Sequence, residues 1–358
     1  MKGSARIAAG LAAVTAAVAM LAAAPASALE VAIGYLRQDE RTLRPLSLLD
    51  AVIDDEGRAG AELGLADNAT TGRFLGHDYA LDARVVPVDG DLAAEAGALL
   101  DGGVRFLVAD LEAADLATVV PLAAERGALV FNVRAADDAL RTERCAPHVF
   151  HVALSRAMKA DALAQYLAWK RWDRWFLLHG TTPADLAMKA ALEAAAAKFG
   201  LRIVATRDYA YEETARRVET GHTLVQRQMP AFTQEAPAHD VVVVADEGDV
   251  FGEFLPYRTF RPRPVVGTQG LVPTNWHRAT EQWGGTQLQH RFEDMAGRAM
   301  RERDYNAWLA LRAIGEAVTR TESAAPDTVR DHLRSDAFGV GAFKGQAVTF
   351  RDWNQQMR

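Results

Sequence analysis

The chain has 358 residues, of which 49% are hydrophobic and 24% charged, and its formal net charge is −7. This length allows two domains with proper cores, and a mildly acidic chain without a basic stripe argues against nucleic acid or an anionic membrane surface as a partner. The single cysteine, Cys145, excludes an internal disulfide, so the fold must rest on the burial of its core.

The first 28 residues predict a secretory signal peptide. Lys2 and Arg6 precede an apolar run over residues 7–24, and the small triplet Ala26-Ser27-Ala28 follows it. This pattern predicts cleavage after Ala28, and a weakly hydrophobic, alanine-rich run before a cleavage site does not favour a membrane anchor. Removing the two basic residues of the leader takes the net charge from −7 to −9. We therefore expect a soluble protein in the periplasm.

The first part of the mature chain alternates short apolar runs with longer amphipathic ones. Strands are expected at residues 31–36, 84–88, 105–110 and 129–133, and helices at residues 56–68, 91–100 and 113–126. Short strands that are apolar on both faces are typical of a parallel sheet covered by helices on each side. The order predicts repeated β-α-β units and a doubly wound sheet.

The same alternation starts again after Ala146-Pro147 and predicts a second lobe. Its expected strands are 148–154, 174–178, 201–207, 240–245 and 264–267, and its expected helices are 156–171, 183–200 and 222–232, the last interrupted by Pro230. A strong late helix at 304–320 comes too late for the second sheet. The fold class predicted is α/β, with two doubly wound open-sheet lobes joined by a hinge. Lobe 1 is expected to comprise residues 29–147 and about 287–340, and lobe 2 residues 148–286 and about 341–358.

Ligands of open α/β sheets bind beyond the carboxyl ends of the strands, and polar residues stand at those ends here. Cations in the first turn of a helix oppose its dipole, which favours an anionic partner for Arg156 and Lys159. An ion pair with Asp39 or Glu40 is an equally good interpretation for Arg37, and an ion pair with Asp137 or Asp138 for Arg134. The predicted ligand-binding residues are Arg37, Gln38, Asp110, Asn132, Arg134, Ser155, Arg156, Lys159, His179, Asp246, Gln269 and Trp276.

Motifs of catalysis and metal binding are missing from the sequence. No Gly-x-Ser-x-Gly elbow, phosphate-binding loop or His-Glu-x-x-His motif is present, and no Gly-x-Gly-x-x-Gly follows the first strand. The nine histidines show no spacing typical of metal ligands. The sequence therefore predicts neither an enzyme nor a metal site.

Four segments resemble a known family. They are Ile33-Gly-Tyr-Leu-Arg-Gln-Asp39, Leu65-Ala-Asp-Asn-Ala-Thr-Thr-Gly-Arg-Phe-Leu-Gly76, Tyr305-Asn-Ala-Trp-Leu-Ala-Leu-Arg-Ala-Ile314 and Phe338-Gly-Val-Gly-Ala-Phe-Lys-Gly345. With the leader and the two lobes, they resemble type I periplasmic binding proteins, with the branched-chain amino acid receptors as the broad group. More specifically, they resemble the substrate-binding components of ABC transporters that accompany pyrroloquinoline quinone (PQQ)-dependent alcohol dehydrogenase systems.

The resemblance implies a monomer that takes up PQQ by hinge closure and docks on an ABC permease. PQQ is a flat tricarboxylate, for which Arg37, Arg134, Arg156 and Lys159 are suitable cations. Trp276 or Trp283 is available for stacking, and Lys159 for reversible addition to the quinone carbonyl.

Two alternatives to PQQ uptake remain open. One is a receptor for a branched-chain or other amino acid or an aromatic acid, and the other is a periplasmic protein that delivers the cofactor to a dehydrogenase. Asp110-Leu111 and Asn132-Val133-Arg134 stand where the branched-chain receptors have a Ser-and-Thr signature, which argues against a branched-chain amino acid. Asp246 or Glu247 remains suitable for a ligand ammonium.

Overall fold

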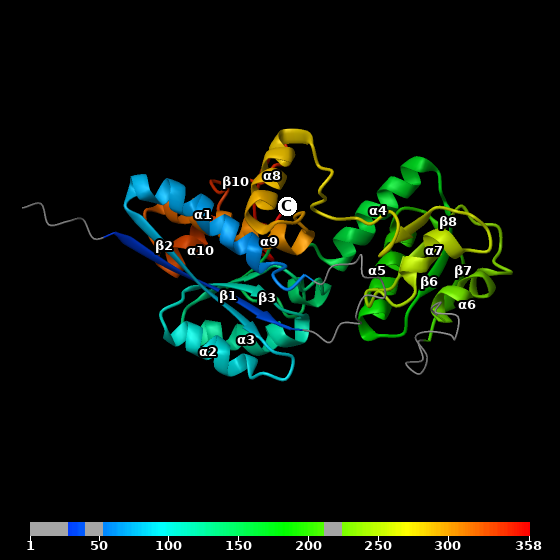
Figure 1. Ribbon diagram of the computed structural model, residues 1–358, viewed down its shortest axis with the longest axis horizontal. Helices are drawn as coiled ribbons and strands as arrows, with labels where there is room; N and C mark the ends of the chain where they lie inside the picture. Colours follow the sequence, from blue (N-terminus) through cyan, green and yellow to red (C-terminus); the bar gives the residue numbers. More distant parts are fainter. Residues whose placement is uncertain (1–27, 40–52, 211–223) are drawn as a thin grey trace, which may run out of the picture.

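The computed structural model describes residues 28–39, 53–210 and 224–358, which form two α/β lobes (Figure 1). Each lobe has its own open parallel sheet with helices on both faces, so the predicted fold class is confirmed. The predicted signal peptide lies outside the described residues except for Ala28, and its cleavage stays a prediction.

Lobe 1 is built from two separate stretches of the chain. The first contains β1 (Leu29–Gln38), α1 (Arg58–Leu75), β2 (His77–Val86), α2 (Leu92–Asp101), β3 (Phe106–Asp110), α3 (Ala113–Glu125), β4 (Leu129–Asn132), η1 (Asp138–Arg141) and β5 (Val149–His151). The second contains η3 (Gln282–Gly284), α8 (Gly285–Ala296), α9 (Glu302–Thr321), α10 (Pro326–Leu333), β10 (Val340–Gly341) and β11 (Ala347–Val348). The strand order β2-β1-β3-β4-β5 brings the ends of β1 and β3 together.

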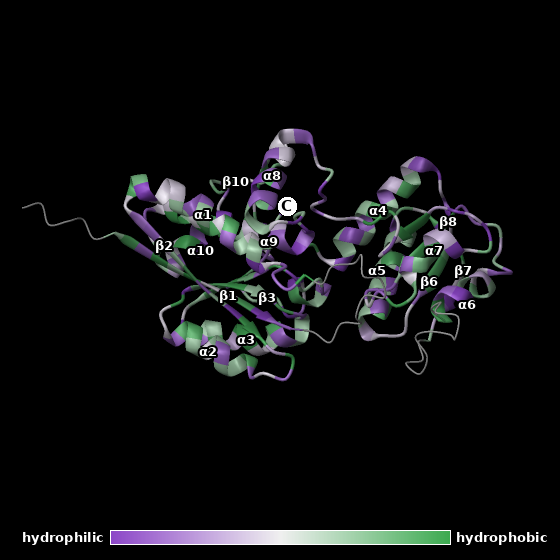
Figure 2. Ribbon diagram, viewed as in Figure 1, coloured by the Kyte–Doolittle hydropathy of each residue, from purple (hydrophilic) through white to green (hydrophobic). Residues whose placement is uncertain are grey.

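Two helical layers cover the sheet of lobe 1, with α1, α9 and α10 on one face and α2 and α3 on the other (Figure 1). Every residue of β3 and β4 is buried between these layers, which is why their sequences are continuous apolar runs. Figure 2 shows hydrophobic residues gathered on the strands, while the helices alternate hydrophobic and hydrophilic residues. β2 begins at His77, seven residues before the predicted strand, because it pairs with β1 along its whole length.

Small residues on α1 let α9 approach its backbone closely. A Cβ atom at Gly60 would lie 1.9 Å from the carbonyl oxygen of Asp304, and one at Gly64 would lie 2.6 Å from the Cβ of Leu311. This close packing makes α9 the central helix of lobe 1, since it also contacts β3 and α10. The late helix predicted from the sequence is thus confirmed, and it belongs to the core of lobe 1.

The prediction that the first helix ends near Asn68 is wrong. α1 continues to Leu75 and ends at Gly76, which adopts the left-handed conformation with φ 72°. Asn68 is buried inside the helix because its amide serves α9: Nδ2 donates to the carbonyl of Leu311 at 2.7 Å, and Oδ1 accepts from Arg312. Tertiary hydrogen bonds therefore outweigh the weak helix propensity of asparagine.

Lobe 2 is one continuous stretch. It contains α4 (Arg156–Lys170), β6 (Arg174–His179), α5 (Pro183–Lys198), β7 (Arg202–Asp208), α6 (Leu224–Thr233), β8 (Val241–Ala245), η2 (Gly252–Phe254), α7 (Leu255–Arg258) and β9 (Val265–Gly267), and its sheet has the order β7-β6-β8-β9. The side chain of Ser155 caps α4 as predicted, and Thr182 and Asp185 form a capping box at α5. Pro230 lies within α6 and does not interrupt it.

The chain crosses between the lobes after β5 and again after β9, and the structure divides it differently from the prediction. Residues 149–151, expected to open lobe 2, pair with β4 in the first sheet. Residues 341–358, also expected in lobe 2, pack on lobe 1: Val348, Phe350 and Met357 join its core, and Gln356 forms a bridge with His151. An apolar sequence predicts a strand, but it does not predict which of the two sheets the strand pairs with.

Candidate functional site

A buried cluster of polar side chains lies at the carboxyl ends of β1 and β3. Tyr35 donates its hydroxyl to Oδ2 of Asp110 at 2.6 Å, and Arg303 donates from Nε and Nη2 to Oδ1 of the same carboxylate at 3.1 and 2.9 Å. Burial, together with the charge of Asp110, holds the pKa of Tyr35 well above its usual value, so the phenol stays a donor. Asp110, one of the predicted residues, is thus fully engaged by the protein.

Arg37 and Arg134 place two more guanidinium groups at this end of the sheet. Arg37 donates to the carbonyl of Glu56 at 3.1 Å and pairs with Asp39 at 2.6 Å. Arg134 forms an ion pair with Glu112 at 2.8 Å. Arg37 thus pairs with Asp39, one of the acids that its neighbouring sequence offers. The acid paired with Arg134 is Glu112, at the start of α3, whereas the sequence offered Asp137 or Asp138, and Asp137 pairs with Arg156.

Arg134 lies in a region that disfavours its charge. Burial, and secondly repulsion by Arg303 and Arg37, lower the pKa of Arg134 to about 9. Three guanidinium groups therefore share one poorly hydrated edge of lobe 1. An anionic group placed there would gain more binding free energy than the same group beside a solvated arginine.

Gln38 and Asn132 are bonded to the loops around them. Nε2 of Gln38 donates to the carbonyls of Pro87 and Val88 at 3.1 and 3.2 Å. Oδ1 of Asn132 accepts the backbone amides of Arg134 and Ala135 at 3.1 and 2.8 Å, and its Nδ2 donates to the carbonyl of Ala135 at 2.8 Å. These two predicted residues shape the loops that present the arginines.

Arg156 and Lys159, in the first turn of α4, contact carboxylates on both lobes. Arg156 donates to both carboxylate oxygens of Glu247 in lobe 2, at 2.9 and 2.7 Å, and to Asp137 in lobe 1 at 2.8 Å. Lys159 donates to Glu302 at the start of α9 at 2.9 Å. The predicted anionic partners exist, and they are side chains of the protein itself.

The predicted residues of lobe 2 lie at the carboxyl ends of β6, β8 and β9. His179 is buried, with Nδ1 2.7 Å from the carbonyl of Gly180. Asp246 accepts the backbone amides of Val250, Phe251 and Gly252 at 3.1, 2.8 and 2.6 Å. Asp246 therefore holds the loop after β8 in shape.

Two further side chains of this edge are partly or fully engaged. Gln269 donates to Asp249. Glu247 is held by Arg156, yet its side chain keeps 26% exposure, so a solute can reach this carboxylate.

Trp276 lies in the core of lobe 1 and not on the cleft. It is 3% exposed, and its ring stacks on Tyr305 with centroids 4.9 Å apart. Lys344 lies over both rings, 5.7 Å from the Trp276 centroid and 4.9 Å from that of Tyr305. The prediction that Trp276 stacks on a ligand does not fit this burial, whereas Trp283 is 62% exposed.

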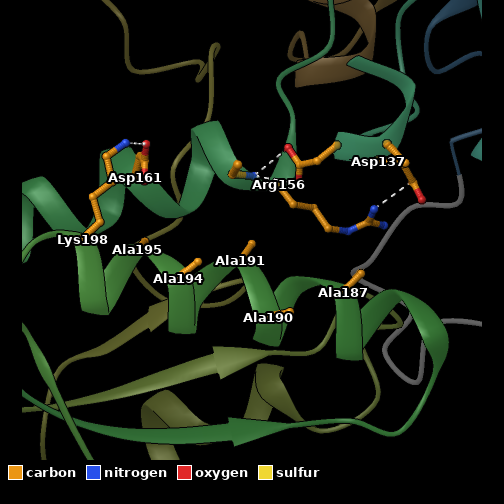
Figure 3. A pocket seen from close by; sticks show the side chains of 12 residues that line it. Asp137, Arg156, Asp161, Ala187, Ala190, Ala191, Ala194, Ala195 and Lys198 are labelled. Atoms are coloured by element: carbon orange, nitrogen blue, oxygen red, sulfur yellow. Dashed lines mark hydrogen bonds and ion pairs between the residues drawn. The ribbon is translucent and has the colours of Figure 1, made fainter. Parts of the chain in front are cut away.

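A groove of about 590 Å³ lies where α4 and α5 meet the η1 segment of lobe 1 (Figure 3). Alanines of α5 form its floor, and Asp137 and Arg156 lie at one end, with Asp161 and Lys198 paired at the other at 2.5 Å. The groove therefore borders the contact between the lobes, and its charged side chains are already paired.

Sequence reasoning missed Tyr35, Glu56 and Arg303. Glu56 is largely buried, which raises its pKa, and its backbone carbonyl accepts from Arg37. Tyr35 lies within the predicted first strand. Its hydroxyl group was the one signal in the sequence that this strand residue could take part in a polar site. Arg303 comes from the first turn of α9, far along the chain, and no local pattern connects it to β3.

No group of three or more His, Cys, Asp or Glu side chains in the described ranges is placed to share a metal ion. A separate observation concerns membranes: among the residues that the structure describes, no helix combines the length and apolar character needed to cross one.

Known proteins resemble this chain in sequence or in fold. Residues 43–216 match the family model described as periplasmic binding protein. No curated protein sequence gives a match. Among solved structures, a periplasmic binding protein from Burkholderia mallei is 16% identical, with 92% of this chain and 88% of that chain covered and a TM-score of 0.66.

Two other solved structures carry ligand names. The leucine-, isoleucine-, valine-, threonine- and alanine-binding protein from Brucella ovis, in a closed conformation, is 12% identical over 92% of this chain and 87% of that chain, with a TM-score of 0.70. An ABC transporter substrate-binding protein from Desulfitobacterium hafniense in complex with Leu is 17% identical over 92% and 94%, with a TM-score of 0.68. At these identities the likeness shows the fold. The matched segment and these structures show that the chain has the fold of the type I periplasmic binding proteins.

Proposed function

We propose that this chain is the solute-binding component of an ABC importer, and that its solute carries both a carboxylate and an ammonium group, as an amino acid does. The observation that carries the proposal is the crowding of three guanidinium groups at the strand ends of lobe 1, together with a partly exposed carboxylate of lobe 2. Arg37, Arg134 and Arg303 are each paired with an acid of lobe 1, yet burial and the repulsion by Arg303 and Arg37 lower the pKa of Arg134. Glu247 of lobe 2, paired with Arg156, keeps 26% of its side chain exposed.

Arg156 links the two edges, because it donates to Asp137 of lobe 1 at 2.8 Å and to Glu247 of lobe 2 at 2.7 Å. A solute carboxylate would bind beside Arg134, where an anion relieves the crowding of cations. Its ammonium would bind Glu247, in exchange for part of the contact with Arg156.

The comparisons support the amino-acid class over PQQ. The family consists of solute-binding proteins, and the structures from Brucella ovis and Desulfitobacterium hafniense are named for amino-acid ligands. The family also implies the periplasm as location, and an ABC permease as partner follows from the transporter type of these neighbours.

PQQ is the second candidate, because three guanidinium groups match its three carboxylates. Its two other supports are weaker in the structure. Trp276 is stacked on Tyr305 inside the core, and an ammonium of Lys159 held by Glu302 at 2.9 Å is not a nucleophile.

Binding would act through the hinge. A solute that contacts the arginines of lobe 1 and Glu247 of lobe 2 makes both sets of contacts only when the lobes are close. It therefore shifts the population towards the closed arrangement, which is the form expected to dock on the permease.

A titration tests the proposal. Leader-free protein is titrated in a calorimeter with leucine, alanine, glutamate, PQQ and benzoate, and Arg134→Ala is expected to weaken binding of the bound solute by roughly 10- to 100-fold, as for one charge-assisted contact. Arg320→Ala is the matched control, because Arg320 is an exposed arginine of α9 paired only with Glu316. Binding of PQQ without any amino acid would replace the amino-acid proposal with the second candidate. Equal loss in both variants would remove Arg134 from the site.

A further inference from the structure

The first turn of α4 belongs to lobe 2 by packing, yet it is held to lobe 1 by a backbone hydrogen bond from Arg156 to the carbonyl of Ala136 at 2.9 Å and by three contacts with acidic side chains. Arg156 donates to Asp137 at 2.8 Å, the backbone amide of Ala157 donates to Asp138 at 3.2 Å, and Lys159 donates to Glu302 at 2.9 Å. Figure 3 shows the contact between Arg156 and Asp137 from close by. The rest of α4 packs into the core of lobe 2 through Ala160, Leu163 and Leu167. These contacts therefore join two bodies that have separate cores.

Arg156 is the central member of this set. Its guanidinium uses Nη1 for Asp137 of lobe 1 and Nε and Nη2 for Glu247 of lobe 2, and its side chain is only 7% exposed. Two cations in the first turn of a helix oppose the helix dipole, so their position is unfavourable unless acids compensate them. The acids that compensate these cations are Glu247 of lobe 2 and Asp137 and Glu302 of lobe 1. Part of the compensation of the two cations therefore comes from contacts between the lobes.

Glu302 connects the same contact to the second crossover. Its Oε2 accepts from Lys159, while its Oε1 lies 3.4 Å from the backbone nitrogen of Asn275 on the segment that returns from lobe 2. Lys344 donates to the carbonyl of Asn275, and Asn275 donates from Nδ2 to Asn306 of α9 at 2.6 Å. Both connections between the lobes thus meet at the start of α4 and α9.

We infer that Asp137, Asp138, Arg156, Lys159 and Glu302 form a hinge clamp, an electrostatic contact that sets the angle between the lobes in the absence of solute. The clamp stabilises the observed arrangement and determines how much of a solute's binding free energy is used in moving the lobes. Its residues thereby tune affinity without having to touch the solute. The inference holds whichever solute the protein takes.

Distance measurements between spin labels test the hinge clamp without any solute. Cys145→Ser removes the natural thiol, and Phe74→Cys on lobe 1 and Tyr257→Cys on lobe 2 give labelling positions that are 88% and 85% exposed in the native chain. The test variant combines Asp137→Asn with Glu302→Gln, which leaves Arg156 paired with Glu247. The control is Asp161→Asn, which breaks an ion pair of the same helix α4, with Lys198, inside lobe 2.

The expected result has two parts. At about 0.1 M sodium chloride the parent gives one narrow distance distribution. At about 1 M the Debye length falls from roughly 10 Å to roughly 3 Å, which weakens the pair of Lys159 and Glu302, whose side chains are each 26% exposed, and a second distance gains population. The test variant shows the second distance at both salt concentrations, with the ratio of populations changed roughly 5- to 30-fold, and the control follows the parent.

A test variant that follows the control at both salt concentrations overturns the hinge clamp. A parent distribution unchanged by salt does the same, and this second measurement decides the matter if the test variant fails to fold. Because no solute is present, either outcome leaves the proposed transport function untouched.

Discussion

At the scale of single residues, the burial of His151 makes the stability of the protein depend on pH. It ends β5, is fully buried, and its Nδ1 lies 3.0 Å from Nδ2 of Asn132, which acts as the donor. Burial, and secondly the charge of Arg141, lower the pKa of His151 to about 3. The folded protein therefore holds a neutral imidazole that the unfolded chain protonates near pH 6.5.

The sign of the resulting pH dependence follows directly. Above pH 6.5 both states carry a neutral ring and the full stability is present; as the pH falls towards 3, the unfolded state binds a proton that the folded state refuses, and stability is lost. We expect this histidine to contribute a loss of up to about 1.4 kcal/mol per pH unit in that window. Urea unfolding at pH 7 and pH 5, in the parent and in His151→Gln, measures it. An equally steep loss in the variant would assign the pH dependence to other groups.

At the scale of elements, the contact between α1 and α9 depends on the absence of side chains. A Cβ atom on Gly60 would meet backbone atoms of Asp304, which cannot move aside as a side-chain end can. We expect Gly60→Ala to destabilise the protein by about 3 kcal/mol, the upper end of the range for an overpacked core.

Gly97 supplies the matched control for this substitution. It lies inside α2, and a Cβ atom there would find no other atom within 4 Å. Gly97→Ala should therefore stabilise by about 0.5–1 kcal/mol through helix propensity alone. Denaturant titration of both variants gives the two signs, and a destabilised Gly97→Ala would contradict the argument from open space.

Most elements could be predicted from the sequence because their causes are local. The valine run of β8, the cap at Ser155 and the proline at the start of α5 each specify structure over a few neighbouring residues. The end of α1 could not be predicted, because Asn68 is held in the helix by Leu311 and Arg312 from a distant segment.

The site was predicted in outline and missed in detail for the same reason. Strand ends pointed to Arg37, Asp110 and Arg134, which the structure brings to one edge. Arg303, the partner of Asp110, has a position that depends on how α9 packs. Trp276 was expected to contact a ligand and lies in the core instead. The local sequence predicts which polar side chains stand at the end of each strand, whereas tertiary packing determines the partner with which each side chain interacts.

At the scale of the whole molecule, the two lobes have separate cores. Buried residues of lobe 1 and of lobe 2 form distinct clusters. Heat unfolding in a calorimeter should show both lobes stabilised by a solute that contacts both, by about 2.7 kcal/mol at a solute concentration one hundred times the Kd. If only one of two transitions moved, the solute would bind a single lobe and closure would have another cause.

The returning C-terminal segment has a consequence for how the molecule is made. Arg141 donates to Gln356, and Gln356 donates to the carbonyls of His151 and Ala153, so residues near the end of the chain secure the first crossover. Lobe 2 is continuous and can fold as soon as its own residues are present, whereas lobe 1 must wait for α9 and Gln356. Early folding of lobe 2 brings the two halves of lobe 1 close together and shortens the loop that they must close. Lobe 2 therefore serves the assembly of lobe 1 as a folded insert, before any solute is met.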